Sequence, residues 1–222
     1  MNEFFNQYRE LLWKGTLDTL YMTVTATFFA YVIGLPLGVL LTTTKQGAIL
    51  PAPRFNAVFG SFINVLRSLP FMILMIFIIP VTRFLVGTSI GTIAGTVPLI
   101  IAACPFVARM VETSLEEVDH GMIDAAKCMG ATNFQVVTRV LLVESIPSLL
   151  RGLSISTITI LGYTAITGAI GAGGLGDIAY RYGYQRYRKE VMYATIVLLL
   201  LLVCMIQGIC NLLARRADKR NR

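Results

Sequence analysis

The stretch 112–147, ETSLEEVDHGMIDAAKCMGATNFQVVTRVLLVESIP, places a small polar helix between two strongly hydrophobic segments. At its centre stands Asp124-Ala125-Ala126, and Gly130 follows four residues after the second alanine. Alanine favours a helix and leaves its surface low enough for another protein to approach closely. Glycine tolerates the left-handed backbone that closes many helices, so we expect the helix to end at Gly130 and the chain to turn back. The stretch predicts a docking element.

Two further observations bear on this interpretation. Asp119 and Asp124 suit the positive end of a helix dipole, which favours a helix beginning near them. An ordinary loop helix that holds small residues by chance is the alternative for the Ala-Ala-x-x-x-Gly core alone. The position of the helix between two hydrophobic segments favours docking.

The composition excludes an ordinary soluble domain. Of the 222 residues, 55% are hydrophobic and only 14% are charged. Because a helix needs about 20 apolar residues to cross a bilayer, we expect an all-α integral membrane protein. The sequence predicts a single transmembrane domain over 1–222, with a cytoplasmic loop at about 112–139 and five spans near 17–43, 57–82, 91–111, 140–167 and 191–213.

The distribution of basic residues orients the chain. Five spans place the two termini on opposite sides of the membrane. The basic tail favours a cytoplasmic C-terminus, because Lys and Arg are enriched in cytoplasmic segments; it holds Arg215, Arg216, Lys219, Arg220 and Arg222. A cytoplasmic docking loop requires the same orientation, with the N-terminus outside.

One motif typical of enzymes has a structural interpretation in this chain. Gly171–Gly176 matches the dinucleotide pattern Gly-x-Gly-x-x-Gly, yet it follows a predicted membrane span and no βαβ unit surrounds it. We expect its glycines to permit a tight turn. The sequence holds no Gly-x-x-x-x-Gly-Lys-Ser/Thr motif, and its four cysteines form no Cys-x-x-Cys pair. We therefore expect no enzyme activity, cofactor or metal in this chain, and any ATPase that drives it is a separate polypeptide.

Arg67, Ser68 and Pro70 are candidates for a translocation path or gate. The second predicted span places the Arg67 charge inside the membrane, which costs at least ~2.5 kcal/mol at the bilayer centre. Pro70 removes a backbone hydrogen bond, which a membrane helix tolerates where neighbours or a water-lined cavity satisfy the freed group. A snorkelling arginine and a static kink are the alternatives.

Ser154, Thr157 and Thr164 form a polar stripe at helical spacing on the fourth predicted span. Hydroxyl groups in membrane helices line solute paths, and they also form hydrogen bonds between helices. The sequence leaves both interpretations open.

The spacing of the docking element resembles the cytoplasmic loop of membrane subunits of bacterial ABC importers. That loop has Glu or Asp, two alanines, three residues, glycine, nine residues and an apolar, proline-containing stretch. Many members of the family have proline where this chain has Val143, although Pro147 is present. The resemblance implies that the helix docks onto an ATPase subunit, through the coupling residues Glu116, Glu117, Asp124, Ala125, Ala126 and Gly130.

Over nearly the whole chain the sequence resembles the permease subunits of methionine ABC importers. The stretches that carry this resemblance are RSLPF at 67–71, LVGTSIG at 85–91, PFVAR at 105–109, GAGGLGD at 171–177 and YGYQR at 182–186. It implies a five-helix subunit of the type I importer fold in the bacterial inner membrane, paired as a homodimer. Two copies of a cytoplasmic ATPase would bind ATP and Mg, and an external binding protein would deliver L-methionine, D-methionine or a close analogue for alternating-access transport.

Three alternatives differ from this expectation. A permease for another amino acid or small polar solute would share the same loop. A secondary transporter or channel typically shows internal repeats, and the chain has no convincing repeat. An intramembrane enzyme would need a catalytic constellation at one depth, which the few charged residues of the spans do not provide.

Overall fold

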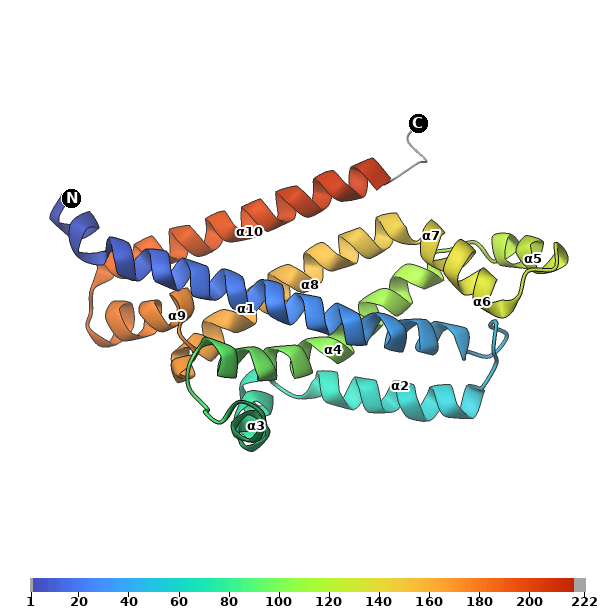
Figure 1. Ribbon diagram of the computed structural model, residues 1–222, viewed down its shortest axis with the longest axis horizontal. Coiled ribbons are helices and arrows are strands. Elements are labelled where there is room, and N and C mark those ends of the chain that lie inside the picture. Colours follow the sequence, from blue (N-terminus) through green and yellow to red (C-terminus); the bar gives the residue numbers. More distant parts are fainter. Residues whose placement is uncertain (1, 218–222) are drawn as a thin grey trace. The chain divides into compact units, whose positions relative to one another are not determined.

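The computed structural model describes the backbone of residues 2–217 and the side chains of residues 8–217. Lys219, Arg220 and Arg222 of the basic tail lie outside this part. The elements follow one another in the order α1 (Asn2–Thr43), α2 (Pro53–Ser68), α3 (Phe71–Val86), α4 (Thr92–Glu116), α5 (His120–Cys128), α6 (Asn133–Gln135), the π-helix η1 (Val136–Leu141), α7 (Leu142–Glu144), α8 (Ile146–Thr167), η2 (Gly168–Ala172), α9 (Gly174–Ile178), η3 (Ala179–Gln185) and α10 (Lys189–Ala217) (Figure 1).

Four helices of the described chain are long and apolar enough to cross a membrane. They cover Tyr8–Thr43, Thr92–Glu116, Ile146–Ala172 and Lys189–Ala217. A bent pair, α2 followed by α3, gives a fifth span if the two helices are counted together. The all-helical fold with up to five spans agrees with the prediction.

The second predicted span, 57–82, is wrong as a continuous helix. The helix is interrupted between Ser68, where α2 ends, and Phe71, where α3 begins. Pro70 explains the break, because the residue before a proline is pushed out of the helical region, and Pro70 itself caps α3 with φ −56° and ψ 129°. Each helix has 16 residues and is about 24 Å long, which is shorter than a usual membrane span.

The chain separates into two compact units. The first comprises the described parts of Met1–Phe29, Leu69–Ala103 and Thr157–Gln207, and the second those of Ala30–Ser68, Cys104–Ser156 and Gly208–Arg222. Buried apolar side chains from α1, α8, α9 and α10 form the core of the first unit: Leu12, Leu161, Leu175, Ile178, Val191 and Leu202.

The second unit is held together by close approach of α1 and α4. A Cβ atom on Gly34 would lie 2.8 Å from Cγ1 of Val107, and one on Gly38 would lie 2.6 Å from Cβ of Val111. Such glycines let two helix backbones pack closely in a membrane protein. The small cluster of Leu41, Ile63 and Ala108 adds α2 to this contact.

The glycine-rich segment 171–176 forms a tight turn in the first unit. Gly171, Gly173 and Gly174 have φ values of 98°, 85° and 80°, which L residues with side chains rarely adopt. Gly176 is needed for a different reason, because a Cβ atom there would lie 2.4 Å from the Ala165 carbonyl oxygen. The structure confirms the conformational interpretation of this motif.

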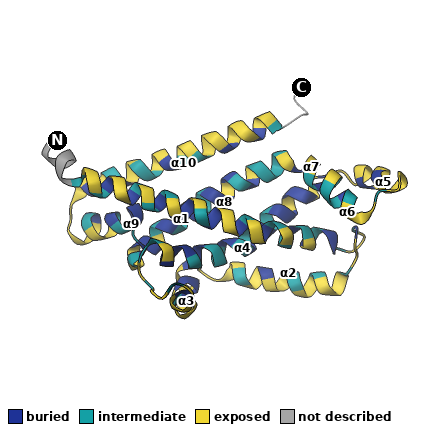
Figure 2. Cartoon of the chain, in the orientation of Figure 1, coloured by how far each residue is buried: buried dark blue, intermediate teal, exposed yellow. Residues whose placement is uncertain are grey.

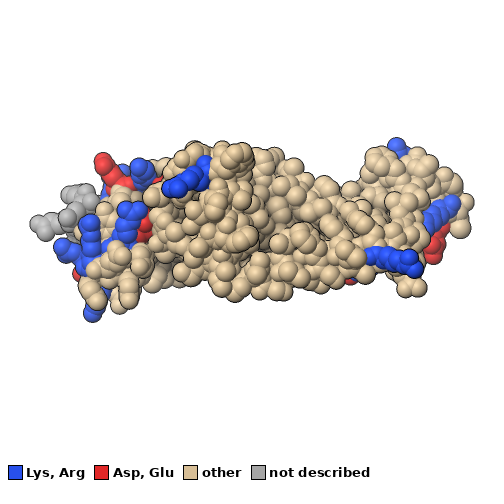
Figure 3. All heavy atoms as spheres, turned by 90° about the horizontal axis from the view of Figure 1, so that it is seen from below, with Lys and Arg blue, Asp and Glu red and all other residues tan. Residues whose placement is uncertain are grey.

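Exposed surface on the long helices is largely apolar. Figure 2 shows much of α10 exposed, and the exposed side chains there include Leu200, Leu201, Met205, Ile209 and Leu212. Figure 3 shows charged atoms gathered near the start of α1 in the first unit and, separately, near α5 in the second. This pattern suits helices in contact with lipid or with other membrane subunits.

Candidate functional site

The candidate docking element folds as the short helix α5. Asp119 is its N-cap, and the Asp119 carboxylate accepts a hydrogen bond from the Gly121 N–H at 2.7 Å. This satisfies one of the free N–H groups in the first turn. Asp124 lies beyond that turn, so the expectation that it serves the helix dipole is wrong; the dipole effect is confined to the terminal turn.

Gly130 ends the helix as predicted. Its φ of 82° is left-handed, and its N–H donates to the Lys127 carbonyl at 2.9 Å. The Ala131 N–H donates to the Ala126 carbonyl at 3.0 Å. These two bonds form a Schellman motif, which satisfies the last carbonyls of the helix and reverses the chain. The next turn starts with a capping box between Thr132 and Gln135, after which η1 and α7 lead into α8.

The two alanines of α5 face different environments. Ala126 is 5% exposed and lies with Ile123 on the buried face of the helix. Ala125 and Asp124 are exposed. The expectation that both alanines form one open surface is therefore wrong, because consecutive residues on a helix point about 100° apart. Only Ala125 is open to a partner.

Two exposed apolar side chains beside α5 were missed by the sequence analysis. Met129 is 82% exposed and Phe134 is 77% exposed. Both follow the helix within six residues of its end. The available signal was an apolar residue in an otherwise polar loop, where exposure of large apolar groups often marks contact with another protein.

The predicted coupling residues Glu116 and Glu117 differ in their surroundings. Glu116, the last residue of α4, forms an ion pair with Lys45. Glu117 is exposed and lines a 320 Å³ cavity with Asp119, Glu144 and Arg151. Four of the six predicted coupling residues are exposed and take part in no ion pair found among the described residues. These are Glu117, Asp124, Ala125 and Gly130.

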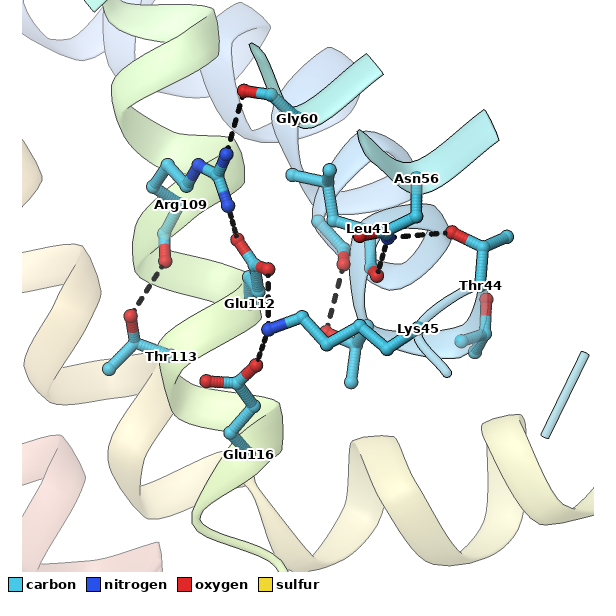
Figure 4. Close-up of polar contacts among 12 residues, drawn as sticks. Leu41, Thr44, Lys45, Asn56, Gly60, Arg109, Glu112, Thr113 and Glu116 are labelled. Atoms are coloured by element: carbon cyan, nitrogen blue, oxygen red, sulfur yellow. Dashed lines mark hydrogen bonds and ion pairs between the residues drawn. The ribbon is translucent and has the colours of Figure 1, made fainter. Parts of the chain in front are cut away.

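Figure 4 shows a charged network just before α5 that the sequence analysis did not predict. The Lys45 ammonium, in the loop after α1, lies 2.9 Å from Oε1 of Glu112 and also bonds Glu116. Oε2 of Glu112 accepts a bond of 2.5 Å from Arg109, whose other terminal nitrogen donates to the Gly60 carbonyl of α2 at 2.8 Å. The Glu112 side chain is only 4% exposed.

The pairing also changes the proton affinity of Lys45. Partial burial lowers the pKa of the Lys45 ammonium, but hydrogen bonds to Glu116 and Glu112 and their negative charges outweigh it. The pKa is consequently raised above the usual 10.5. Lys45 is therefore charged at physiological pH.

Arg67, Ser68 and Pro70 lie together at the break between α2 and α3. Arg67 occupies the last turn of α2, and its guanidinium lies 5.8 Å from the centre of the Phe106 ring. The Ser68 hydroxyl donates to the Asn64 carbonyl at 2.8 Å. Arg67 thus sits at a helix end rather than in the middle of a continuous span.

The hydroxyls of the predicted polar stripe on α8 are buried. Ser154, Thr157 and Thr164 are 5%, 9% and 1% exposed. The Thr164 hydroxyl donates to the Leu161 carbonyl of its own helix at 2.6 Å. The Thr164 hydroxyl is therefore satisfied within its own helix.

Comparison with known proteins identifies the family. Residues 34–219 match the model of the binding-protein-dependent transport system inner membrane component. The chain is 45% identical over 218 residues to a probable D-methionine transport system permease protein MetI of Vibrio cholerae, covering 98% of this chain and 97% of the relative. It is 44% identical to the methionine import system permease protein MetP of Bacillus subtilis, covering 94% of each chain.

Solved structures agree with these relatives. A chain from an inward-facing MetNI methionine ABC transporter superposes with a TM-score of 0.95 at 46% identity, covering 96% of this chain and 99% of that one. A chain from an amino acid ABC transporter has a TM-score of 0.77 at 22% identity, which reflects a shared fold. The chain therefore belongs to the family of binding-protein-dependent transport system inner membrane components, the membrane subunits of ABC importers.

Proposed function

We propose that this chain is the membrane-spanning permease of an ATP-driven importer that passes methionine, or a close analogue, into the cytoplasm. The observation that carries the proposal is the 46% identity and TM-score of 0.95 to a permease chain of a methionine ABC transporter, over 96% of this chain. Both L-methionine and D-methionine are candidate substrates. A related amino acid or small polar solute is the competing outcome of the test.

The transporter would be assembled from several polypeptides. Two copies of this chain would form the membrane path, two ATPase subunits would bind ATP and Mg in the cytoplasm, and a binding protein would deliver the solute from outside. The exposed apolar faces of the helices support contact with lipid and with a second copy. In this arrangement α5 and the C-terminus lie in the cytoplasm and the N-terminus lies outside.

We assign the docking contact to the exposed side of α5. Asp124 and Ala125 lie on that side, Gly130 reverses the chain beyond it, and Met129 and Phe134 add apolar area. A small residue at the centre with apolar groups at the edge suits insertion into a groove of the ATPase. Closure of the ATPase subunits on ATP would push α5, and the membrane helices would alternate between facing inward and outward.

The test is ATP-dependent uptake of labelled methionine by proteoliposomes that contain this chain, the ATPase subunit and the binding protein. Gly130→Val is the docking variant, and Gly87→Val is its matched control. Both glycines have φ near 80° and open space where a Cβ would stand, but Gly87 caps α3 in the other unit. Both variants therefore carry similar backbone strain.

We expect uptake by the wild type and by Gly87→Val, together with loss of ATPase co-purification and uptake in Gly130→Val. An equal loss of ATPase co-purification and uptake in both variants would mean that backbone strain causes the loss. Normal ATPase binding in Gly130→Val would overturn the docking assignment. ATP hydrolysis stimulated by the binding protein without methionine uptake would support an importer for a different solute.

A further inference from the structure

The network around Lys45 joins three helices of the second unit. Lys45 stands two residues after α1, Glu112 and Glu116 lie on the last turns of α4, and Arg109 connects Glu112 to the backbone of α2 at Gly60. Figure 4 shows these side chains pointing toward one another from their separate elements. Only the segment 117–119 separates this end of α4 from α5.

The buried carboxylate of Glu112 makes the arrangement specific. Its side chain is 4% exposed and lies between the ammonium of Lys45 and the guanidinium of Arg109. A buried charge is costly unless it is paired, so Glu112 strongly favours positions of α1 and α4 in which both cations reach it. Few alternative arrangements of these helices satisfy this requirement.

A cavity lies beside the ion pair of Lys45 and Glu116. The 340 Å³ cavity is lined by Gln46 and Gly47 of the loop on one side and by Ile123 and Lys127 of α5 on the other. Lys45 and Glu116 also border this cavity. The ion pair between Lys45 and Glu116 therefore links the loop to α4 at the edge of this cavity.

We propose that Lys45 is a positioning residue that transmits movement of α5, through Glu116 and Glu112, to the end of α1. The inference rests on the proposed function, since it assumes that an ATPase moves α5. When α5 is displaced, the end of α4 moves with it, and Lys45 makes the end of α1 follow. Without this ion bridge, α4 shifts while α1 lags, and ATP hydrolysis is poorly converted into transport.

Lys45→Met tests the bridge, because methionine keeps an unbranched side chain and removes the charge. Lys45→Arg retains a cation, and Gln46→Met introduces the same residue at the next position of the loop. Uptake of methionine and ATP hydrolysis are measured on the same proteoliposomes, with ATPase co-purification as a check on assembly. The readout is the number of solute molecules taken up per ATP hydrolysed.

We expect Lys45→Met to bind the ATPase normally and to hydrolyse ATP within about twofold of wild type, as for a substitution outside the docking surface. Uptake per ATP should fall at least about fivefold, the lower end of typical coupling between sites. Lys45→Arg should recover most of the ratio, and Gln46→Met should match wild type. A merely structural role would lower hydrolysis and uptake together and leave their ratio unchanged.

Glu116→Gln provides a second variant that is expected to fold, because Glu116 is 44% exposed. The double variant Lys45→Met/Glu116→Gln should be no worse than Lys45→Met alone, since residues of one ion pair act as a unit. A wild-type ratio in Lys45→Met, or loss of ATPase binding in that variant, would overturn the transmission role. Failure of the wild type to take up methionine would instead contradict the proposed function.

Discussion

The hydroxyl oxygen of Thr19 accepts a hydrogen bond of 2.8 Å from the backbone N–H of Leu175. Thr19 lies on α1 and Leu175 on α9, and both residues are at most 1% exposed. The same hydroxyl donates to the Gly15 carbonyl at 2.9 Å. One side chain thus anchors the glycine-rich segment 171–176 to α1, at a place where water cannot replace the bond.

Thr19→Val should destabilise the protein by about 1–3 kcal/mol, because it preserves shape but leaves the buried Leu175 N–H without an acceptor. Thr19→Ser is the control, since serine keeps the hydroxyl oxygen. Thermal unfolding of the two purified variants in detergent measures the difference. An equal midpoint for valine and serine would show that the hydrogen bond contributes nothing to stability.

Gly176→Ala should prevent close packing of α9 on α8. The added Cβ would lie 2.4 Å from the Ala165 carbonyl oxygen, which belongs to the backbone and cannot rotate away. Gly162→Ala is the control. Gly162 lies on α8, no neighbouring atom is within 4 Å of the new Cβ, and alanine is a better helix former than glycine.

Expression level and the temperature of aggregation in detergent compare these two variants. We expect a large loss for Gly176→Ala and an unchanged or slightly raised value for Gly162→Ala. A Gly176→Ala protein as stable as wild type would mean that the backbone relaxes easily at this contact.

Local patterns allowed the docking element to be predicted in some detail. The end of α5 at Gly130 follows from a single residue type and its backbone freedom. Asp119 was expected only near the positive end of the helix dipole, and its role as N-cap was not predicted. The different surroundings of Ala125 and Ala126 were not predicted, because composition reports which residues are small but says nothing about which face packs against η1.

Nonlocal relationships could not be predicted. Pro70 was recognised, but whether a proline kinks a span or divides it depends on the surroundings of the freed backbone groups. Arg109, Glu112 and Glu116 share one helix face by their spacing of three and four residues. Lys45, the partner of Glu112 and Glu116, is 67 and 71 residues away from them in the sequence, so no local periodicity connects it with them.

Arg67→Ala should reduce methionine uptake without releasing the ATPase, because Arg67 lies at the break between α2 and α3 and not on α5. The guanidinium over the Phe106 ring is worth about 0.5–1 kcal/mol in an exposed setting. Phe106→Leu separates this contact from the charge, and Arg67→Lys retains the charge. Uptake that is unchanged in Arg67→Ala would make the residue structural.

Alkaline pH should abolish the stabilisation that Lys45 provides. Its pKa is raised in the folded protein from the usual 10.5, so the unfolded chain loses this proton first as the pH rises. The contribution of the ammonium is therefore complete below the usual value of 10.5 and is lost as the pH rises through the folded value. We expect wild type to unfold at a higher temperature than Lys45→Met at neutral pH, with a gap that closes only at pH above 10.5.

Gln46→Met should follow wild type throughout, which controls for the titration of other groups. A gap that closes well below pH 10 would contradict the assignment, because at that pH free lysine is still mostly charged.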